Sequence, residues 1–455
     1  MTTHQVPQPS PAAQLEDRIR SRAAVVGVVG LGYVGLPLAH AAHASGLSVL
    51  GFDLDEAKIA ALDAGTNYLK HLGDELAADL CASVRFCGTT DFARLAEADV
   101  VMVCVPTPLG RHREPDLGYV LNTATTIGRA LRPGQLLVLE STTYPGTTRD
   151  EFLPAVLAAS ADAGHALVAG QDFFVAYSPE REDPGRKSHS TTTTPKIVGG
   201  IDSDSGRLAS LLYEVFIKEV CTVSSAEVAE ASKLLENIFR AVNIAMVNEM
   251  KMLLEDMDIN IWEVVQAAAT KPFGFMPFYP GPGLGGHCIP IDPFYLTWKA
   301  KEIGRPTRFI ELAGEINTDM PAYVISRLVL ALNDRGKAVR DARVLVLGLA
   351  YKANVDDTRE SPSFELIQQL SGMGALVEYS DPHIARTTPV RKHDLQLSSV
   401  ELTATNIASY DVLLLATAHS AFDYALIAEH AALVVDTRNA LAAHADAMGE
   451  RLVRA

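Results

Sequence analysis

An apolar strand that runs into three spaced glycines constrains the fold of this chain more than any other feature. Residues 24–29 read Ala-Val-Val-Gly-Val-Val, and a helix-like segment follows the glycines. The glycines keep the spacing G-x-G-x-x-G: Gly30, Gly32 and Gly35. Glycines at such a junction permit a tight turn, let the backbone approach a pyrophosphate, and let the helix pack closely on the strand. The segment predicts a Rossmann-type unit that binds a dinucleotide; a glycine turn without a ligand is the alternative.

The next predicted strand, 48–53, ends in Asp53. We expect its carboxylate to accept hydrogen bonds from the adenosine ribose, while its charge would repel a 2′-phosphate. The expected cofactor is therefore NAD and not NADP. Lys58 is expected near the same ribose.

The C-terminal third repeats this plan. In the first unit, further apolar runs at 100–105 and 136–139 predict two more strands. Apolar segments at 344–348, 377–381 and 411–417 match the first unit's segments at 24–29, 48–53 and 99–105, but Gly348 continues into Leu-Ala-Tyr-Lys without the other two glycines. Between the units, residues 224–258 contain no Gly or Pro, which predicts a long helix. The predicted fold class is α/β, with two Rossmann-like doubly wound domains joined by a long central helix.

Charge and cysteine content limit the class of protein. The net charge of −16 at pH 7 argues against broad binding to nucleic acid or a membrane surface, because both need basic residues. No apolar run approaches the roughly 20 residues that cross a bilayer. The five cysteines form no CxxC pair or disulfide-like framework. A cytoplasmic protein without a metal site is therefore expected.

The Gly-rich stretch 279–293 contains Cys288, with Asp292 four residues later. A thiol near a dinucleotide site can attack a carbonyl carbon, which suggests an alcohol taken past the aldehyde to the acid. Asp292 could then orient a water or take a proton. The alternatives are a buried cysteine after a turn and a structural Asp-Pro carboxylate.

Other polar residues stand where ligands are commonly bound. Lys233 and Asn237 share a helix face and could stabilise an oxyanion, unless that face is solvated. Thr142 follows a predicted strand at the carboxyl edge of the sheet. Lys352 and Arg359 follow the first strand of the second unit, where they could bind a nucleotide diphosphate or form a charged surface loop.

Seven motifs occur together in one order, from about residue 24 to the end. They are Gly-Leu-Gly-Tyr-Val-Gly, Val-Pro-Thr107-Pro, Glu-Ser-Thr142, Ser-Pro-Glu180, Lys233-x-x-x-Asn237, Gly-Gly-His-Cys288-x-Pro-x-Asp292, and Gly-Leu-Ala-Tyr-Lys352 with Thr-Arg359-Glu-Ser. In this combination the chain resembles the UDP-glucose/GDP-mannose dehydrogenase family.

The resemblance implies oxidation of the C6 hydroxyl of a UDP-sugar by two NAD molecules. Cys288 would hold the aldehyde as a thiohemiacetal and then as a thioester. A water held by Asp292 and Thr142 would hydrolyse the thioester to a uronic acid. Lys233 and Asn237 would stabilise the oxyanions, and the long helix would build a homodimer or higher homo-oligomer.

The resemblance also implies two sets of contact residues. The cofactor set comprises Gly30, Gly32, Tyr33, Val34, Gly35, Asp53, Lys58, Thr107 and Thr142. The substrate set comprises Glu180, Arg181, Lys233, Asn237, Arg240, Tyr279, Gly285, Lys352 and Arg359, and Glu180 would lie near the substrate or water. The expected segments are a flexible leader at 1–21, an NAD-binding Rossmann domain at 22–205, a central helical dimerisation and catalytic domain at 206–325, and a UDP-sugar-binding Rossmann-like domain at 326–455.

The motif variants indicate which sugar is bound. The sequences Ser178–Gly185 and Pro280–Cys288 resemble the branch that oxidises UDP-N-acetylhexosamines. Pro184 stands about where other members of the family carry an acidic residue, so the role of that acid is not assigned to any residue of this chain. We expect UDP-N-acetylglucosamine, with the manno or galacto epimers and UDP-glucose as alternatives. A two-electron hydroxyacid dehydrogenase and a non-catalytic NAD-binding regulator are more remote alternatives.

Overall fold

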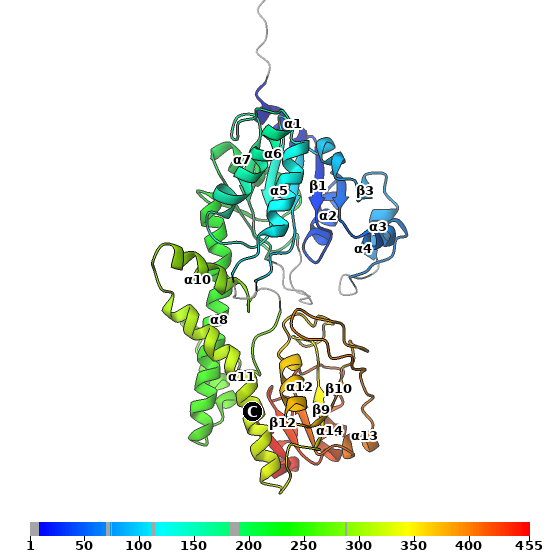
Figure 1. Cartoon of the computed structure of the whole chain (residues 1–455), viewed down its shortest axis with the longest axis vertical. Helices are drawn as coiled ribbons and strands as arrows, with labels where there is room; N and C mark the ends of the chain where they lie inside the picture. The colour runs from blue at the N-terminus through cyan, green and yellow to red at the C-terminus, as the bar shows by residue number, and fades with distance from the viewer. Residues whose placement is uncertain (1–8, 70–72, 74, 111–113, 182–190, 287–288) are drawn as a thin grey trace, which may run out of the picture. The chain divides into compact units, whose positions relative to one another are not determined.

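The computed structural model describes residues 9–69, 73, 75–110, 114–181, 191–286 and 289–455. The chain divides into two compact units, Met1–Glu236 and Asn237–Ala455. Each contains one mainly parallel sheet with helices on both faces (Figure 1). The predicted α/β fold with two Rossmann-like sheets is confirmed.

Over its described residues, the sheet of the first unit has eight strands in the order β3-β2-β1-β4-β5-β6-β7-β8, and among these only β6 and β7 pair antiparallel. Four of its strands lie where apolar segments predicted them: β1 (Val25–Val29), β2 (Ser48–Phe52), β4 (Val100–Val103) and β5 (Leu136–Leu139). The others are β3 (Phe86–Thr89), β6 (Phe174–Tyr177), β7 (Lys196–Gly200) and β8 (Val220–Thr222).

Alternate side chains of these strands enter two separate cores because successive residues of a strand point to opposite faces. On β4, Val100 and Met102 belong to one core, and Val101 and Val103 to the other. The first core is covered by α1 (Pro11–Arg20), α2 (Gly35–Ala44), α3 (Glu56–Asp63), α4 (Glu75–Cys81) and α7 (Ser203–Glu214). The second is covered by α5 (Gly118–Ala130) and α6 (Leu153–Asp162).

The N-terminal segment differs from the flexible leader expected at 1–21. Residues Pro11–Arg20 form α1, which is capped by Ser10, and its Leu15 and Ile19 are buried in the first core. Two apolar residues four apart were enough to anchor a helix that a polar, Pro-rich composition concealed. The boundary expected at 205 falls inside α7, because that helix supplies Leu208 and Leu212 to the same core.

The sheet of the second unit has five parallel strands in the order β10-β9-β11-β12-β13. They are β9 (Arg343–Leu347), β10 (Leu376–Ser380), β11 (Val412–Leu415), β12 (Val434–Asp436) and β13 (Leu452–Arg454). Helices α11 (Arg308–Asn333) and α12 (Pro362–Gly372) cover one face. The other face is covered by α13 (Ala404–Ala408), α14 (Tyr424–His430) and α15 (Ala445–Met448). The boundary expected at 325 falls inside α11.

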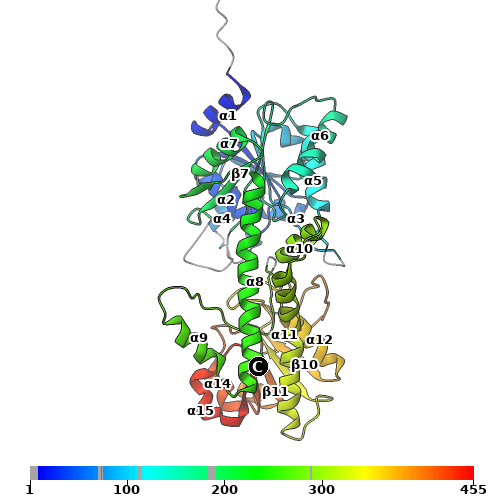
Figure 2. The same cartoon turned by 90° about the vertical axis from the view of Figure 1, so that its left-hand side faces the viewer.

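The predicted long helix is confirmed as α8 (Ala226–Asp256), one unbroken helix of 31 residues (Figure 2). At 1.5 Å per residue it is about 46 Å long. Two short helices, α9 (Ile261–Ala269) and α10 (Asp292–Glu302), follow it before α11. Among the described residues, no helix combines the length and apolar character needed to span a bilayer.

Candidate active site

The three glycines after β1 each serve a distinct purpose. Gly30 has a φ of +91°, and a Cβ there would lie 2.5 Å from the carbonyl oxygen of Cys104. A Cβ on Gly35 would lie 1.8 Å from the carbonyl oxygen of Gly30, so α2 can start this close to β1 only with glycine. A Cβ on Gly32 would meet nothing within 4 Å. The turn is closed at the first and third glycines and open at the second, which suits a pyrophosphate.

The neighbours of the open glycine lie at the start of α2. Tyr33 is half-buried against the first core, and Val34 is the N-cap residue of the helix. The side chain of Val34 makes no capping hydrogen bond at this N-terminus. Its N–H groups therefore fit the anionic part of a dinucleotide.

Asp53 lies at the end of β2 beside the glycine turn. Its carboxylate accepts hydrogen bonds from the backbone N–H of Leu31 (2.9 Å) and from Nζ of Lys58 (2.9 Å). The hydroxyl of Tyr68 donates to the carbonyl of Leu31 at 2.6 Å, a contact that sequence patterns did not indicate. The acid, the lysine and the turn therefore form one group, and its binding of the adenosine ribose stays a prediction.

Thr107 and Thr142 follow β4 and β5, which are neighbouring strands. Thr107 is buried and Thr142 is half-buried. The hydroxyl of Ser141 donates to the carbonyl of Val105 at 2.7 Å and so ties the two strand ends together. Both threonines thus lie at the carboxyl edge of the sheet, where α/β folds bind ligands.

Glu230 of α8 anchors this helix to the segment that follows Thr142. Its carboxylate accepts hydrogen bonds from the N–H of Gly146 (2.6 Å), the N–H of Thr148 (2.9 Å) and the hydroxyl of Thr148 (2.7 Å). Burial raises its pKa to about 7 despite these bonds. Lys233 follows one turn later and is buried, so it does not lie on a solvated helix face.

Glu180 and Arg181 follow β6. The guanidinium of Arg181 pairs with Glu236 of α8 (2.6 Å) and donates to the carbonyl of Pro195 (2.7 Å). Glu180 lies near Lys196, whose ammonium is 2.6 Å from the buried carboxylate of Glu140. Lys196 was absent from the predicted site because a lysine in a short strand gives no sequence signal, and Glu140 appeared there only as part of the Glu-Ser-Thr142 motif, without a role.

In the second unit, the structure joins two predicted catalytic residues. The amide of Asn237 donates to Oδ2 of Asp292 at 2.5 Å, and both side chains are buried. Asp292 is the first residue of α10 and is 2% exposed to solvent. His287 and Cys288 lie outside the described residues, so the predicted nucleophile has no structural description.

The Gly-rich segment before Cys288 contacts the loop after β9. A Cβ on Gly285 would lie 2.5 Å from Cβ of Tyr351, and the N–H of Gly286 donates to the carbonyl of Arg359 at 2.9 Å. The half-buried Lys352 lies in the same loop, while the guanidinium of Arg359 pairs with Asp357 at 2.6 Å. Three predicted substrate positions therefore gather in one place.

Two further predicted substrate residues are more exposed. Arg240 lies on an exposed part of α8, and the half-exposed ring of Tyr279 stacks on Trp262 at 5.8 Å. Sequence reasoning missed Arg438, which follows β12. A Cβ on Gly281 would lie 2.3 Å from Nη1 of Arg438, so this guanidinium lies directly against the Gly-rich segment. Such a cation suits a phosphate group.

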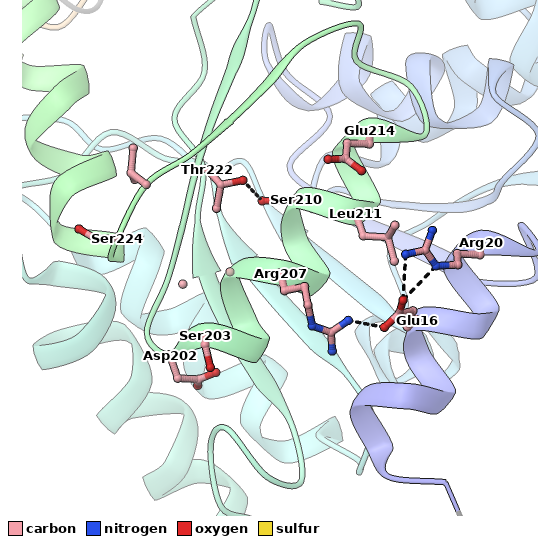
Figure 3. Close-up of a pocket in the computed structure, with 13 residues that line it drawn as sticks. Glu16, Arg20, Asp202, Ser203, Arg207, Ser210, Leu211, Glu214, Thr222 and Ser224 are labelled. Carbon is pink, nitrogen blue, oxygen red and sulfur yellow. Dashed lines mark hydrogen bonds and ion pairs between the residues drawn. The ribbon is translucent and has the colours of Figure 1, made fainter.

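A separate pocket of about 410 Å³ opens between α1, α7 and the strands β7 and β8 (Figure 3). Glu16 lies there between Arg20 (2.9 Å) and Arg207, and Figure 3 shows both ion pairs. The pocket contains none of the predicted site residues. Its charged groups pair with one another across α1 and α7, which is consistent with a structural role in holding the N-terminal helix.

Comparison with known proteins identifies three consecutive regions. This chain matches three domains of the UDP-glucose/GDP-mannose dehydrogenase family. The NAD binding domain matches residues 24–217, the central domain residues 227–319 and the UDP binding domain residues 345–443. The chain is 36% identical over 398 residues to UDP-N-acetyl-D-glucosamine 6-dehydrogenase of Pseudomonas aeruginosa, covering 87% of this chain and 91% of that protein.

Solved structures give the same result. A structure of UDP-D-ManNAc dehydrogenase from Pyrococcus horikoshii matches with a TM-score of 0.82 and 31% identity, covering 91% of this chain and 96% of that one. A UDP-glucose dehydrogenase from Pyrobaculum islandicum matches with a TM-score of 0.80 and 26% identity, covering 95% and 96%.

Proposed function

Since the chain belongs to the UDP-glucose/GDP-mannose dehydrogenase family and is an NAD-dependent oxidoreductase, we propose that it oxidises a UDP-N-acetylhexosamine at C6 to the uronic acid. UDP-N-acetylglucosamine is the proposed substrate. The 36% identical Pseudomonas aeruginosa relative carries that sugar in its name, and the Gly-rich stretch before Cys288 has the form expected for that branch. The net reaction consumes the alcohol, one water and two NAD and yields the carboxylate, two NADH and three protons.

The first unit contains the residues that would hold the cofactor. The open Gly32 would admit the pyrophosphate, and Asp53 with Lys58 would bind the adenosine ribose. Thr107 and Thr142, at the ends of adjacent strands, would line the way to the reacting end. When bound, NAD supplies a hydride acceptor at each of the two oxidation steps.

The thiolate of Cys288 would add to the C6 aldehyde to form a thiohemiacetal, and the second oxidation would leave a thioester. The tether keeps the aldehyde from hydration or escape. Water would then attack the thioester carbon, pass a proton to Asp292, and release the carboxylate and the thiolate. Lys233 and Asn237 would stabilise the oxyanions of the tetrahedral states, with Glu180 near the substrate or water.

One observation carries this proposal: the 2.5 Å hydrogen bond from Asn237 to Asp292. It brings a helix residue and an acid from distant parts of the sequence into contact, four residues beyond the proposed nucleophile. A hydroxyacid dehydrogenase that stops after two electrons would have no use for such a pair together with a nucleophilic cysteine four residues before its acid.

The proposal is tested by counting NADH formed per sugar consumed. We expect two NADH per molecule of UDP-N-acetylglucosamine, and severe loss of net turnover in Cys288→Ser. One NADH per sugar would favour the two-electron reaction, and no NADH from any sugar would favour a non-catalytic NAD-binding protein. UDP-N-acetylmannosamine, UDP-N-acetylgalactosamine and UDP-glucose, assayed in parallel, identify the sugar.

The outer face of α8 supports a homodimer. Four large apolar side chains on it are 38% to 55% exposed and recur at helical spacing: Phe239, Met246, Met250 and Leu253. A stripe of this kind normally packs against another apolar surface, and we propose that a second copy of the chain covers it. Light scattering should give the mass of a dimer for the natural chain and for Glu249→Gln, and of a monomer for the double change Met250→Glu and Leu253→Glu. An unchanged mass in the double variant would contradict this dimer surface.

A further inference from the structure

Two carboxylates of the first unit share one buried ammonium. Glu140 follows β5 and its side chain is fully buried, while Lys196, the first residue of β7, is 4% exposed. The ammonium lies 2.6 Å from Oε2 of Glu140, and the hydroxyl of Tyr213 donates to the other oxygen of that carboxylate. Both oxygens of Glu140 are therefore occupied from two different elements, β7 and α7.

The same ammonium reaches a proposed substrate residue. Nζ of Lys196 lies 3.4 Å from Oε2 of Glu180, whose other oxygen accepts the N–H of Arg181 at 2.7 Å. The side chain of Glu180 is 15% exposed, whereas that of Glu140 is fully buried. Lys196 thus connects a sealed carboxylate with one that solvent can reach.

The charges of this cluster follow from its surroundings. Burial raises the pKa of Glu140 to about 7, and Lys196 opposes that change. Burial lowers the pKa of Lys196, but Glu140 and Glu180 together raise it above its usual range. Burial also raises the pKa of both Cys104 and Tyr213, which face the cluster from β4 and α7, so they stay neutral. One cation therefore serves two carboxylates.

We propose that Lys196 and Glu140 are positioning residues that hold the carboxylate of Glu180 and set its acidity during oxidation of the sugar. This inference rests on the proposed function, in which Glu180 lies near the substrate or water. The lysine favours the ionised form of Glu180, and Glu140 acts by holding that lysine in place, since its raised pKa leaves Glu140 neutral at acidic pH.

The test compares Lys196→Met, Lys196→Arg and Glu140→Gln by the pH dependence of kcat and kcat/KM. We expect the acid limb of the profile to move up by about 1 pH unit in Lys196→Met, because Glu180 loses its cation. It should stay in place in Glu140→Gln, because Glu140 is already protonated over that limb and the change removes no charge. Lys196→Arg keeps the charge and should restore most of the activity lost in Lys196→Met.

A second measurement does not need turnover. In protein labelled with ¹³C at the glutamate carboxyl, the signal that disappears in Glu180→Gln reports the titration of Glu180 directly. Its midpoint should rise in Lys196→Met and stay in place in Glu140→Gln. A midpoint that does not rise in Lys196→Met, or that rises equally in both variants, overturns the inference. If the midpoints move as expected while the natural chain forms no NADH from any UDP-sugar, the proposed function fails and the inferred control of Glu180 stands apart from it.

Discussion

Replacement of Asp292 by asparagine separates the hydrolytic step from the oxidations. The amide of Asn237 donates to Oδ2 of Asp292 at 2.5 Å, and an asparagine at 292 would still offer an oxygen to that donor. The fold should therefore lose only the difference between a charged and a neutral hydrogen bond, about 1 kcal/mol. The lost base should slow thioester hydrolysis about 100- to 10,000-fold, which corresponds to about 3–5 kcal/mol on the barrier.

Because both oxidations precede hydrolysis in the proposed mechanism, Asp292→Asn should release a rapid burst of two NADH per active site and then turn over slowly. Stopped-flow absorbance measures the burst, and mass spectrometry of the peptide that contains Cys288 should detect the acyl adduct. Asp319→Asn, which changes an exposed carboxylate of α11, is the control and should behave like the natural chain. A burst of one NADH, or slow turnover with no adduct, would refute the role assigned to Asp292.

Three other outcomes follow from the first unit. Gly32→Ala should weaken NAD binding, as measured by calorimetry, without lowering Tm, since its Cβ meets no protein atom within 4 Å. Gly35→Ala should lower both the affinity for NAD and Tm, because its Cβ would lie 1.8 Å from a carbonyl oxygen. Asp53→Asn removes the charge beside Lys58, so the ratio of NADP to NAD affinity should rise. Burial raises the pKa of Glu230 in the folded state from its usual 4.5 to about 7. Its contribution to the free energy of unfolding is therefore fully present below pH 4.5 and is lost as pH rises through 7. The stability of the natural chain relative to Glu230→Gln should therefore fall by roughly 3 kcal/mol between pH 4.5 and 8; a constant difference would contradict the raised pKa.

The central strands could be predicted because their sequences are continuous apolar runs. β1, β2, β4, β5 and β11 lie within the expected segments, since a strand covered on both faces must be apolar throughout, and β9 and β10 each begin one residue before theirs. Strand β7 was not predicted because it starts with a lysine and ends in two glycines. Its lysine is buried only because Glu140 after β5 and Glu180 after β6 meet it, and long-range pairing of that kind leaves no periodic signal.

Site residues followed the same division. The glycine turn with Asp53 could be predicted because its chemistry lies within one strand–helix–strand segment. Asn237 and Asp292 could be named from their motifs, but their contact could not, because it depends on how α8 and α10 pack. Arg438 carried no expectation, since only the fold brings the end of β12 to Gly281.

The turn after β9 copies the turn after β1. Gly348 has a φ of +87° and a Cβ there would lie 2.5 Å from the carbonyl oxygen of Thr417, while the N–H of Leu349 donates to Asp381 at 2.7 Å as that of Leu31 does to Asp53. However, α12 begins only at Pro362, whereas α2 begins at Gly35. The longer connection withdraws the helix N-terminus from the turn and puts the side chains of Lys352 and Arg359 in that region instead. The same strand and turn can thus be followed either by a helix N-terminus or by a loop with basic side chains. Restoring glycines after Gly348 alone would therefore not create a second dinucleotide site.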